Sequence, residues 1–343
     1  MNIHILLFCP TDLNQMCSVN GVLSGSKPVT CGIPQGSILR PLLFLIYIND
    51  LPGSLEFSSV RMFADDTTLT ASGESVLDAE LAINHDLANI KQWLSANKLS
   101  LNLVKTEYLL IGSRHNINNL FHAPKVHVGD IPIKRVKETK ALGVYIDEFL
   151  SWNKHIEVIS KKISSGIGAI RKLKPHVDHN TLICAYNALV LPHFDYCCEV
   201  WDTINLTLCN RLQKLQNRAA RIIVGRINEH GQSELALAEL NWKTLSERRA
   251  QFVASQMYKI THDLAPKRLS NIFHETPSSR HYNLRGSSTK LCLPHPKTDY
   301  LKKSLSYRGA KLWNSLSDDI RNKESLAAFK TSIRAPGQVL KST

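Results

Sequence analysis

The sequence predicts an α+β fold, with a small antiparallel sheet within residues 1–150 and helices after it. Two observations support this prediction. Before residue 150, short apolar runs alternate with turn residues, a pattern typical of strands and hairpins. After Ser151, apolar residues recur at steps of three and four, which is the period of amphipathic helices. We therefore expect three regions, at 1–150, 151–230 and 231–343.

The first elements follow from turn and capping signals. Asn20-Gly21 marks a hairpin within residues 18–31, which continue in extended form. Pro41 would lie in the first turn of a helix over residues 37–49, capped by Ser37. This helix is apolar on most faces, so we expect it to be buried.

A second helix should begin at Ser75, because Asp78 stands three residues later and completes a capping box. Its core-facing stripe is expected to consist of Leu77, Leu81, Leu87, Ile90 and Leu94. Further strands are expected at 101–103, 108–111, 126–128 and 142–146.

Helical periodicity dominates the remainder. The first helix there should bury Ile156, Ile159, Ile163, Ile167 and Ile170. A second covers about 180–191, and a third buries Leu208, Leu212, Leu215, Ala219 and Ile222 and ends at Gly225. Helices are also expected at 244–263 and 308–330, with a loop near 275–300.

The charge is distributed unevenly along the chain, whose net charge is +13. Residues 1–150 hold 12 Lys+Arg and 14 Asp+Glu, a net charge of −2. The later residues hold 30 basic and 15 acidic residues, a net charge of +15. This asymmetry indicates a polyanionic partner for the second half, and a merely soluble basic surface is the alternative. The candidates for contact with a nucleic-acid backbone are Lys161, Lys162, Arg218 and Arg221.

The eight cysteines are scattered and no signal peptide is evident, which favours an intracellular, reducing compartment, the nucleus or the cytoplasm. Adjacent Cys197-Cys198 and the isolated Cys292-x-x-His295 do not predict a zinc site. The apolar run 42–48 is too short to span a membrane, so no membrane partner is expected.

The most informative motif is Phe63-Ala64-Asp65-Asp66, which lies between two apolar stretches. It predicts a strand, a tight turn with two charges and a returning strand. Adjacent carboxylates at a hairpin tip suit a hard divalent cation, although acidic turns are more often only solvated.

Three other blocks accompany this motif: Cys31-Gly32-Ile33-Pro34-Gln35-Gly36-Ser37, residues 100–107 and residues 140–146. In this order and spacing they resemble the palm of reverse transcriptases, in particular those of non-LTR retrotransposons of the jockey and chicken-repeat type. Residues 194–201 resemble the region that follows the palm in the same elements. The resemblance implies a partial polymerase palm, an antiparallel sheet with backing helices, followed by an α-helical thumb-like region and a C-terminal helical region.

The resemblance implies RNA-directed DNA synthesis by two-metal phosphoryl transfer, with an RNA template, a DNA primer and deoxynucleotides as partners. Asp65 and Asp66 match the catalytic carboxylates that bind Mg²⁺ or Mn²⁺. Lys105 matches a lysine that could protonate the departing pyrophosphate, and a surface lysine at a strand end is the alternative.

Other matched residues are implied to contact substrates. Pro34, Gln35 and Gly36 correspond to the nucleotide and template site, where a purely structural turn is the alternative. Phe63 and Ala64 correspond to residues beside the primer terminus. Leu142-Gly143 resembles the primer-grip hairpin, where glycine permits a tight turn. Arg40 departs from the family, in which glycine usually precedes that proline.

The family also has an earlier strand with an Asp and an Ala-Phe-Asp motif, well before the block that contains Gly32. Asp12 is the only carboxylate among the 31 residues before Gly32, and the fingers are missing. We therefore expect an N-terminally truncated enzyme whose metals are incompletely liganded and whose activity is impaired. The alternatives are a non-catalytic nucleic-acid-binding relic that uses the basic helical half, and a product with no selected role.

Overall fold

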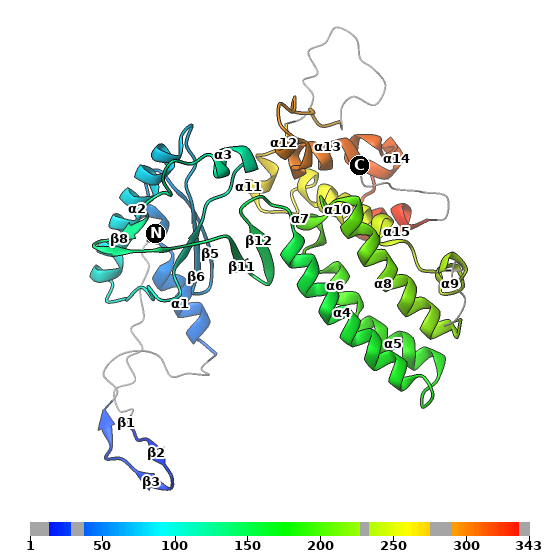
Figure 1. The fold of residues 1–343 in the computed structure, drawn as a ribbon, viewed down its shortest axis with the longest axis horizontal. Helices are drawn as coiled ribbons and strands as arrows, with labels where there is room; N and C mark the ends of the chain where they lie inside the picture. The colour runs from blue at the N-terminus through cyan, green and yellow to red at the C-terminus, as the bar shows by residue number, and fades with distance from the viewer. Residues whose placement is uncertain (1–13, 29–37, 227–232, 275–289, 336–343) are drawn as a thin grey trace. The chain divides into compact units, whose positions relative to one another are not determined.

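The computed structural model describes residues 14–28, 38–226, 233–274 and 290–335. The chain divides into two compact units (Figure 1). The first contains residues 1–108 and 118–136, and the second contains residues 109–117 and 137–343. Helices and paired strands are both present, so the predicted α+β class is confirmed. None of the helices in these described ranges is long and apolar enough to cross a membrane.

The first unit holds most of the strands. Its elements, with β7 at its boundary, are β1 (Asn14–Gln15), β2 (Ser18–Val19), β3 (Val22–Leu23), β4 (Lys27–Pro28), α1 (Arg40–Ile48), the 3₁₀ helix η1 (Leu51–Ser54), β5 (Ser59–Phe63), β6 (Asp66–Thr70), α2 (Val76–Ala96), β7 (Glu107–Leu109), β8 (His127–Val128), β9 (Ile131–Pro132) and β10 (Lys134–Val136). β1 pairs with β4, β2 with β3, β5 with β6 and β8 with β9, all antiparallel, and β7 pairs with β10. The expected sheet is thus present as separate two-stranded pairs.

Local signals in this unit act largely as predicted. Asn20 and Gly21 both have positive φ and form the two-residue turn between β2 and β3. Ser75 and Asp78 form the expected capping box at the start of α2. Leu87 and Ile90 are buried on α2, where they contact Leu69 of the β5–β6 hairpin.

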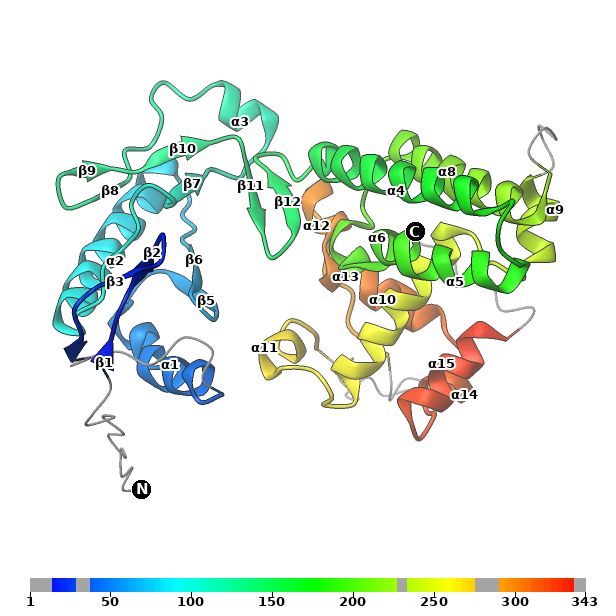
Figure 2. The same ribbon diagram turned by 90° about the horizontal axis from the view of Figure 1, so that it is seen from below.

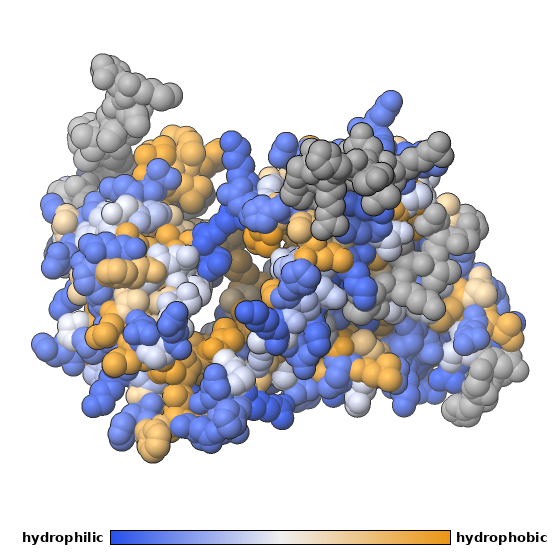
Figure 3. Space-filling view, turned by 90° about the horizontal axis from the view of Figure 1, so that it is seen from above, coloured by the Kyte–Doolittle hydropathy of each residue, from blue (hydrophilic) through white to orange (hydrophobic). Residues whose placement is uncertain are grey.

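Three predictions for this unit are wrong. Helix α1 is mostly exposed, with only Ile48 buried. It begins after Leu39, whose side chain makes no capping hydrogen bond, and the predicted cap Ser37 lies outside the described residues. On α2, Leu77 and Leu81 are 60% and 61% exposed, because the turn of about 100° per residue places them on a different face of the helix from Ile83, which packs against the core. Residues 101–103 lead into a turn rather than forming a strand, since Asn102 accepts backbone hydrogen bonds from Lys105 and Thr106. Exposed apolar side chains form orange areas among hydrophilic ones in Figure 3.

The second unit is mainly helical. Its elements, with α3 at its boundary, are α3 (Arg114–Asn118), β11 (Glu138–Ala141), β12 (Val144–Asp147), α4 (Asn153–Leu173), α5 (His179–Leu189), α6 (Leu191–Asp195), α7 (Cys198–Trp201), α8 (Leu206–Val224), α9 (Ser233–Glu239), α10 (Leu245–Thr261), α11 (Lys267–Ser270), α12 (Asp299–Lys303), α13 (Leu305–Ser315), α14 (Asp318–Arg321) and α15 (Leu326–Arg334). α4 and α8 run side by side in both ribbon views (Figures 1 and 2).

The predicted apolar stripes are buried in this unit except for Leu215 of α8, which is half-buried. All five isoleucines of the α4 stripe are buried, and they share one core with Leu208, Leu212 and Ala219 of α8. Gly225, with φ of 99°, ends α8 as predicted. The expected helix at 308–330 is instead three helices, because Ser317 and Ser325 lie in extended backbone where α14 and α15 begin. Of the loop expected near 275–300, residues 275–289 lie outside the described residues.

Candidate metal and nucleic-acid sites

The Asp65-Asp66 pair lies at the tip of the β5–β6 hairpin. Phe63 pairs with Asp66, so Ala64 and Asp65 form a two-residue turn in which Ala64 has φ of 51°. This left-handed conformation is uncommon for a residue with a side chain. Both carboxylates are exposed, and Phe63 is 66% exposed beside them. The acidic tip is thus open to an approaching ligand.

The base of the hairpin is fixed by packing and by a buried carboxylate that sequence analysis missed. Met62 and Leu69 pack against the core that contains Ile90. On α2, Asp86 is fully buried and accepts hydrogen bonds from the backbone N–H groups of residues 56–58, at 3.0, 3.1 and 2.5 Å. Burial alone would raise the pKa of Asp86, but these hydrogen bonds outweigh it and lower the pKa. The segment that enters β5 is therefore tied to α2.

The carboxylate oxygens at the tip are the type of ligand that a hard divalent cation prefers. Mg²⁺ in phosphoryl-transfer sites is commonly held by one or two carboxylates together with substrate phosphates and water. Within the described ranges, no group of three or more His, Cys, Asp or Glu side chains could hold a metal ion. Asp65 and Asp66 would therefore be the protein's ligands from this hairpin.

The other residues predicted around this hairpin are dispersed or undescribed. Lys105 is exposed in a turn, where its N–H donates to Asn102 Oδ1 at 3.2 Å. Pro34, Gln35 and Gly36 lie outside the described residues. In the part of the chain that is described, no hydrogen bond or ion pair joins Lys105 to the hairpin.

Leu142 and Gly143 form the tip of the β11–β12 hairpin, with φ of 45° and 88°. This tip rests on Tyr196, whose hydroxyl donates to the Leu142 carbonyl at 2.6 Å. A Cβ on Gly143 would lie 3.1 Å from the Tyr196 ring, so glycine allows both the turn and the close approach. The 194–201 motif thus positions this hairpin, a link that the sequence did not reveal.

Asp195 within this motif and Asp202 directly after it form three ion pairs. Asp195 accepts two hydrogen bonds from Arg248 of α10, both at 2.6 Å. The carboxylate of Asp202 is fully buried and pairs with Arg249 at 2.6 Å and with Arg308 of α13. These contacts connect α7, α10 and α13 within the second unit.

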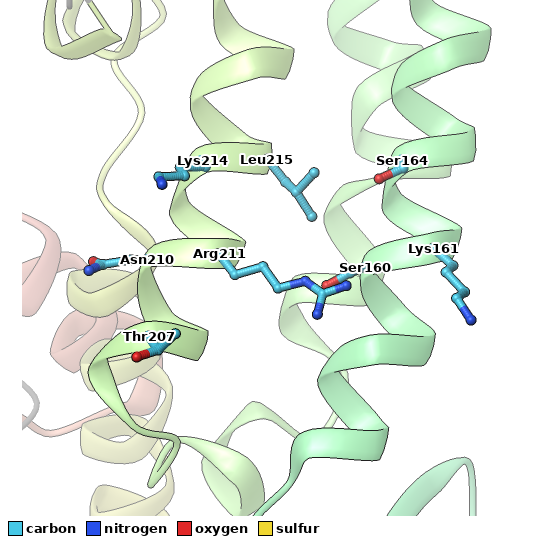
Figure 4. Close-up of a pocket in the computed structure, with 8 residues that line it drawn as sticks. All are labelled: Ser160, Lys161, Ser164, Thr207, Asn210, Arg211, Lys214 and Leu215. Carbon is cyan, nitrogen blue, oxygen red and sulfur yellow. The ribbon is translucent and has the colours of Figure 1, made fainter.

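The basic helices α4 and α8 enclose a groove of about 750 Å³. We call it the α4–α8 groove, and it is lined by Ser160, Lys161, Ser164, Thr207, Asn210, Arg211, Lys214 and Leu215 (Figure 4). The Arg211 side chain reaches from α8 across the groove toward Ser160, whereas Lys161 and Lys214 point outward on either side (Figure 4).

Of the four predicted backbone-binding residues, only Lys161 lines this groove. It is 73% exposed in its side chain and pairs with Glu157 at 2.6 Å. Lys162 and Arg218 are exposed elsewhere on the two helices, and Arg221 is half-buried in the last turn of α8. Sequence analysis missed Ser160 and Arg211 as partners, because helical periodicity gives the face of each residue but not its neighbour on another helix.

Comparison with known proteins shows what the chain is similar to. Residues 3–146 match the family described as "Reverse transcriptase (RNA-dependent DNA polymerase)". This segment is therefore similar to reverse transcriptases, and the relatives of the chain are named as RNA-directed DNA polymerases of mobile elements. The resemblance seen in the sequence is confirmed.

The relatives come from insects. The chain is 24% identical over 213 residues to the probable RNA-directed DNA polymerase from transposon X-element of Drosophila melanogaster, covering 60% of this chain and 23% of that protein. It is 25% identical over 218 residues to the RNA-directed DNA polymerase from mobile element jockey of the same species, covering 61% and 23%. The corresponding protein of transposon BS is 25% identical over 224 residues, covering 62% and 24%. The chain thus spans about a quarter of the length of these relatives. No solved structure matches it.

Proposed function

We propose that this chain takes part in RNA-directed DNA synthesis, with residues 1–150 as a partial palm, 151–230 as a thumb-like region and 231–343 as a C-terminal region. The observation that carries the proposal is the exposed Asp65-Asp66 pair on a packed hairpin, inside the segment that matches reverse transcriptases. The RNA template and DNA primer would be held by the basic helices of the second unit.

The protein's side chains would divide the work as follows. Asp65 and Asp66 would hold Mg²⁺ or Mn²⁺, and such an ion, when bound, stabilises charge on the phosphoryl oxygens. Lys105 would donate a proton to pyrophosphate as it leaves. Phe63, Ala64, Leu142 and Gly143 would contact the primer. Pro34, Gln35 and Gly36 would contact the nucleotide and the template.

We propose further that the 343 residues alone extend a primer weakly. Both identified carboxylates come from one hairpin, whereas two-metal phosphoryl transfer is supported by carboxylates from separate strands. The test is primer extension on an RNA template with Mg²⁺ or Mn²⁺. We expect trace extension that Asp65→Asn abolishes.

The matched control is Asp130→Asn, because Asp130 is an exposed carboxylate in the two-residue turn between β8 and β9. It should extend like the parent chain. Extension that is lost equally in both variants would contradict the role of Asp65. Robust extension by the parent chain, abolished by Asp65→Asn, would instead contradict the proposed weakness.

The alternative function is nucleic-acid binding without catalysis, favoured by the +15 charge of residues 151–343. Binding would be dominated by phosphate contacts and nearly indifferent to sequence. If about five phosphates are neutralised, the log–log salt slope on a duplex should be about −4 to −5. Titration of a labelled RNA–DNA hybrid at several salt concentrations tests this, and affinity that does not change with salt would refute it.

A further inference from the structure

The α4–α8 groove is lined by hydrogen-bond donors and lacks carboxylates. Eight residues line it. Apart from Leu215, these are three residues with hydroxyl groups, one with an amide and three with a positive charge. Arginine, lysine, serine, threonine and asparagine are the side chains that usually contact phosphate oxygens in nucleic-acid complexes. The composition of the groove therefore matches an anionic oxygen ligand.

Ser160 provides independent evidence for a ligand here. It is 3% exposed, and among the described residues its Oγ has no hydrogen-bond partner. A buried hydroxyl without a partner is unfavourable, by roughly 1–3 kcal/mol on mutational scales. The Arg211 side chain extends across the groove toward Ser160, and the Ser164 hydroxyl faces α8 one turn along α4 (Figure 4).

An acidic residue beside the groove, Glu157, leaves its positive charge largely intact. Glu157 lies one turn before Lys161 on α4, and their side chains pair at 2.6 Å. The hydrogen bond from Lys161, followed by the charges of Lys161, Lys154 and Arg211, lowers the pKa of Glu157. Its negative charge is thus compensated mainly by Lys161, which leaves the Arg211 guanidinium for a ligand.

We propose that the α4–α8 groove is a site for one phosphate group of a nucleic-acid backbone, with the Arg211 guanidinium and the Ser160 and Ser164 hydroxyls as donors. Arg211 can give two parallel N–H donors to the phosphate oxygens, and the serine hydroxyls can donate to the same group. Lys161 and Lys214 add positive charge at the rims. This inference rests on the proposed binding of nucleic acid and names one phosphate subsite within it.

The test uses the full chain and a fluorescein-labelled RNA–DNA hybrid titrated at several salt concentrations. Arg211→Gln should make the salt slope shallower by about one and weaken binding to all sequences alike. The control is Arg171→Gln. Arg171 is an exposed arginine on α4, about three turns after Ser160, and it does not line the groove. This variant removes the same charge and should leave the slope closer to the parent value.

Ser160→Ala gives a second readout at constant net charge. We expect it to weaken hybrid binding about tenfold, because a hydrogen bond to a charged group is lost. The thermal midpoint of the free protein should stay equal or rise, since the variant removes an unpaired buried hydroxyl.

Two results would overturn the subsite while the proposed function stands: equal effects of Arg211→Gln and Arg171→Gln, or parental hybrid binding by Ser160→Ala. A parent chain that does not bind the hybrid at any salt concentration would overturn both the subsite and the nucleic-acid binding on which it rests.

Discussion

Removing the buried negative charge of Asp202 should destabilise the second unit strongly. The Asp202 carboxylate is 0% exposed and is shared by Arg249 and Arg308, whose side chains are 4% and 7% exposed. Arg308 also donates to the Glu199 carbonyl at 3.2 Å. Asp202→Asn therefore keeps the shape of the side chain but leaves two buried guanidinium groups without a counter-charge.

The expected loss is about 3–5 kcal/mol of unfolding free energy, as is typical when one partner of a buried ion pair is removed. This is a large share of the roughly 5–15 kcal/mol that holds most domains folded. With a urea m-value of about 1–3 kcal/mol/M, the unfolding midpoint should fall by on the order of 1–5 M.

Tryptophan fluorescence in urea measures this change directly. Trp93 is the single tryptophan of the first unit, so a Trp93→Phe background makes the signal report on the second unit, which contains Trp201. The control is Asp299→Asn, because Asp299 pairs with Lys302 at 3.2 Å and its side chain is 83% exposed. That change should cost less than about 1 kcal/mol.

The reasoning would be refuted if Asp202→Asn unfolded within about 1 kcal/mol of the background protein. In that case the two guanidinium groups would reach water or other acceptors without Asp202. A loss of similar size in both variants would mean that burial does not distinguish the two ion pairs.

Two further predictions concern α4. Gly166→Ala should destabilise the second unit by about 1–3 kcal/mol, because the new Cβ would lie 2.9 Å from the Leu189 carbonyl oxygen. At Gly168 a new Cβ would face open space, so Gly168→Ala should stabilise the helix by up to about 1 kcal/mol. Urea unfolding of both variants checks this, and shifts in the same direction would contradict it. His155 is 2% exposed, and burial, followed by the charge of Lys162, lowers its pKa. The unfolded chain therefore binds a proton near pH 6.5 that the folded chain resists, so stability should fall as pH decreases from about 6.5 toward the lowered pKa. His155→Gln should reduce this loss between pH 7.5 and pH 5.5, and parallel curves for the two proteins would argue against it.

The sequence predicted local structure well wherever one element carries its own signal. The Asp65-Asp66 turn, the Ser75 capping box and the end of α8 at Gly225 all depend on a few neighbouring residues. The isoleucine stripe of α4 was also predicted, because a helix that packs along its whole length repeats its apolar residues at helical spacing.

The errors share a different cause. Apolar content predicted a buried α1, and helical spacing predicted that Leu77 and Leu81 face the core, yet burial depends on whether another element covers that face. The prediction of one helix at 308–330 was wrong for a related reason. The helical spacing of apolar residues continues on both sides of each short extended break between α13, α14 and α15. Residues 34–36 lie outside the described residues, so their predicted contacts stay a prediction.

By itself the sequence determined the likeness to reverse transcriptases, the acidic hairpin and the positive charge of the second half, because each depends on residue type, order and spacing. Only the tertiary structure decided which side chains meet. It brought Tyr196 under the Leu142-Gly143 turn and Arg211 beside the unpaired hydroxyl of Ser160. These partners lie about 50 residues apart in the chain, and helical or strand periodicity specifies the direction of a side chain but not the element packed against it.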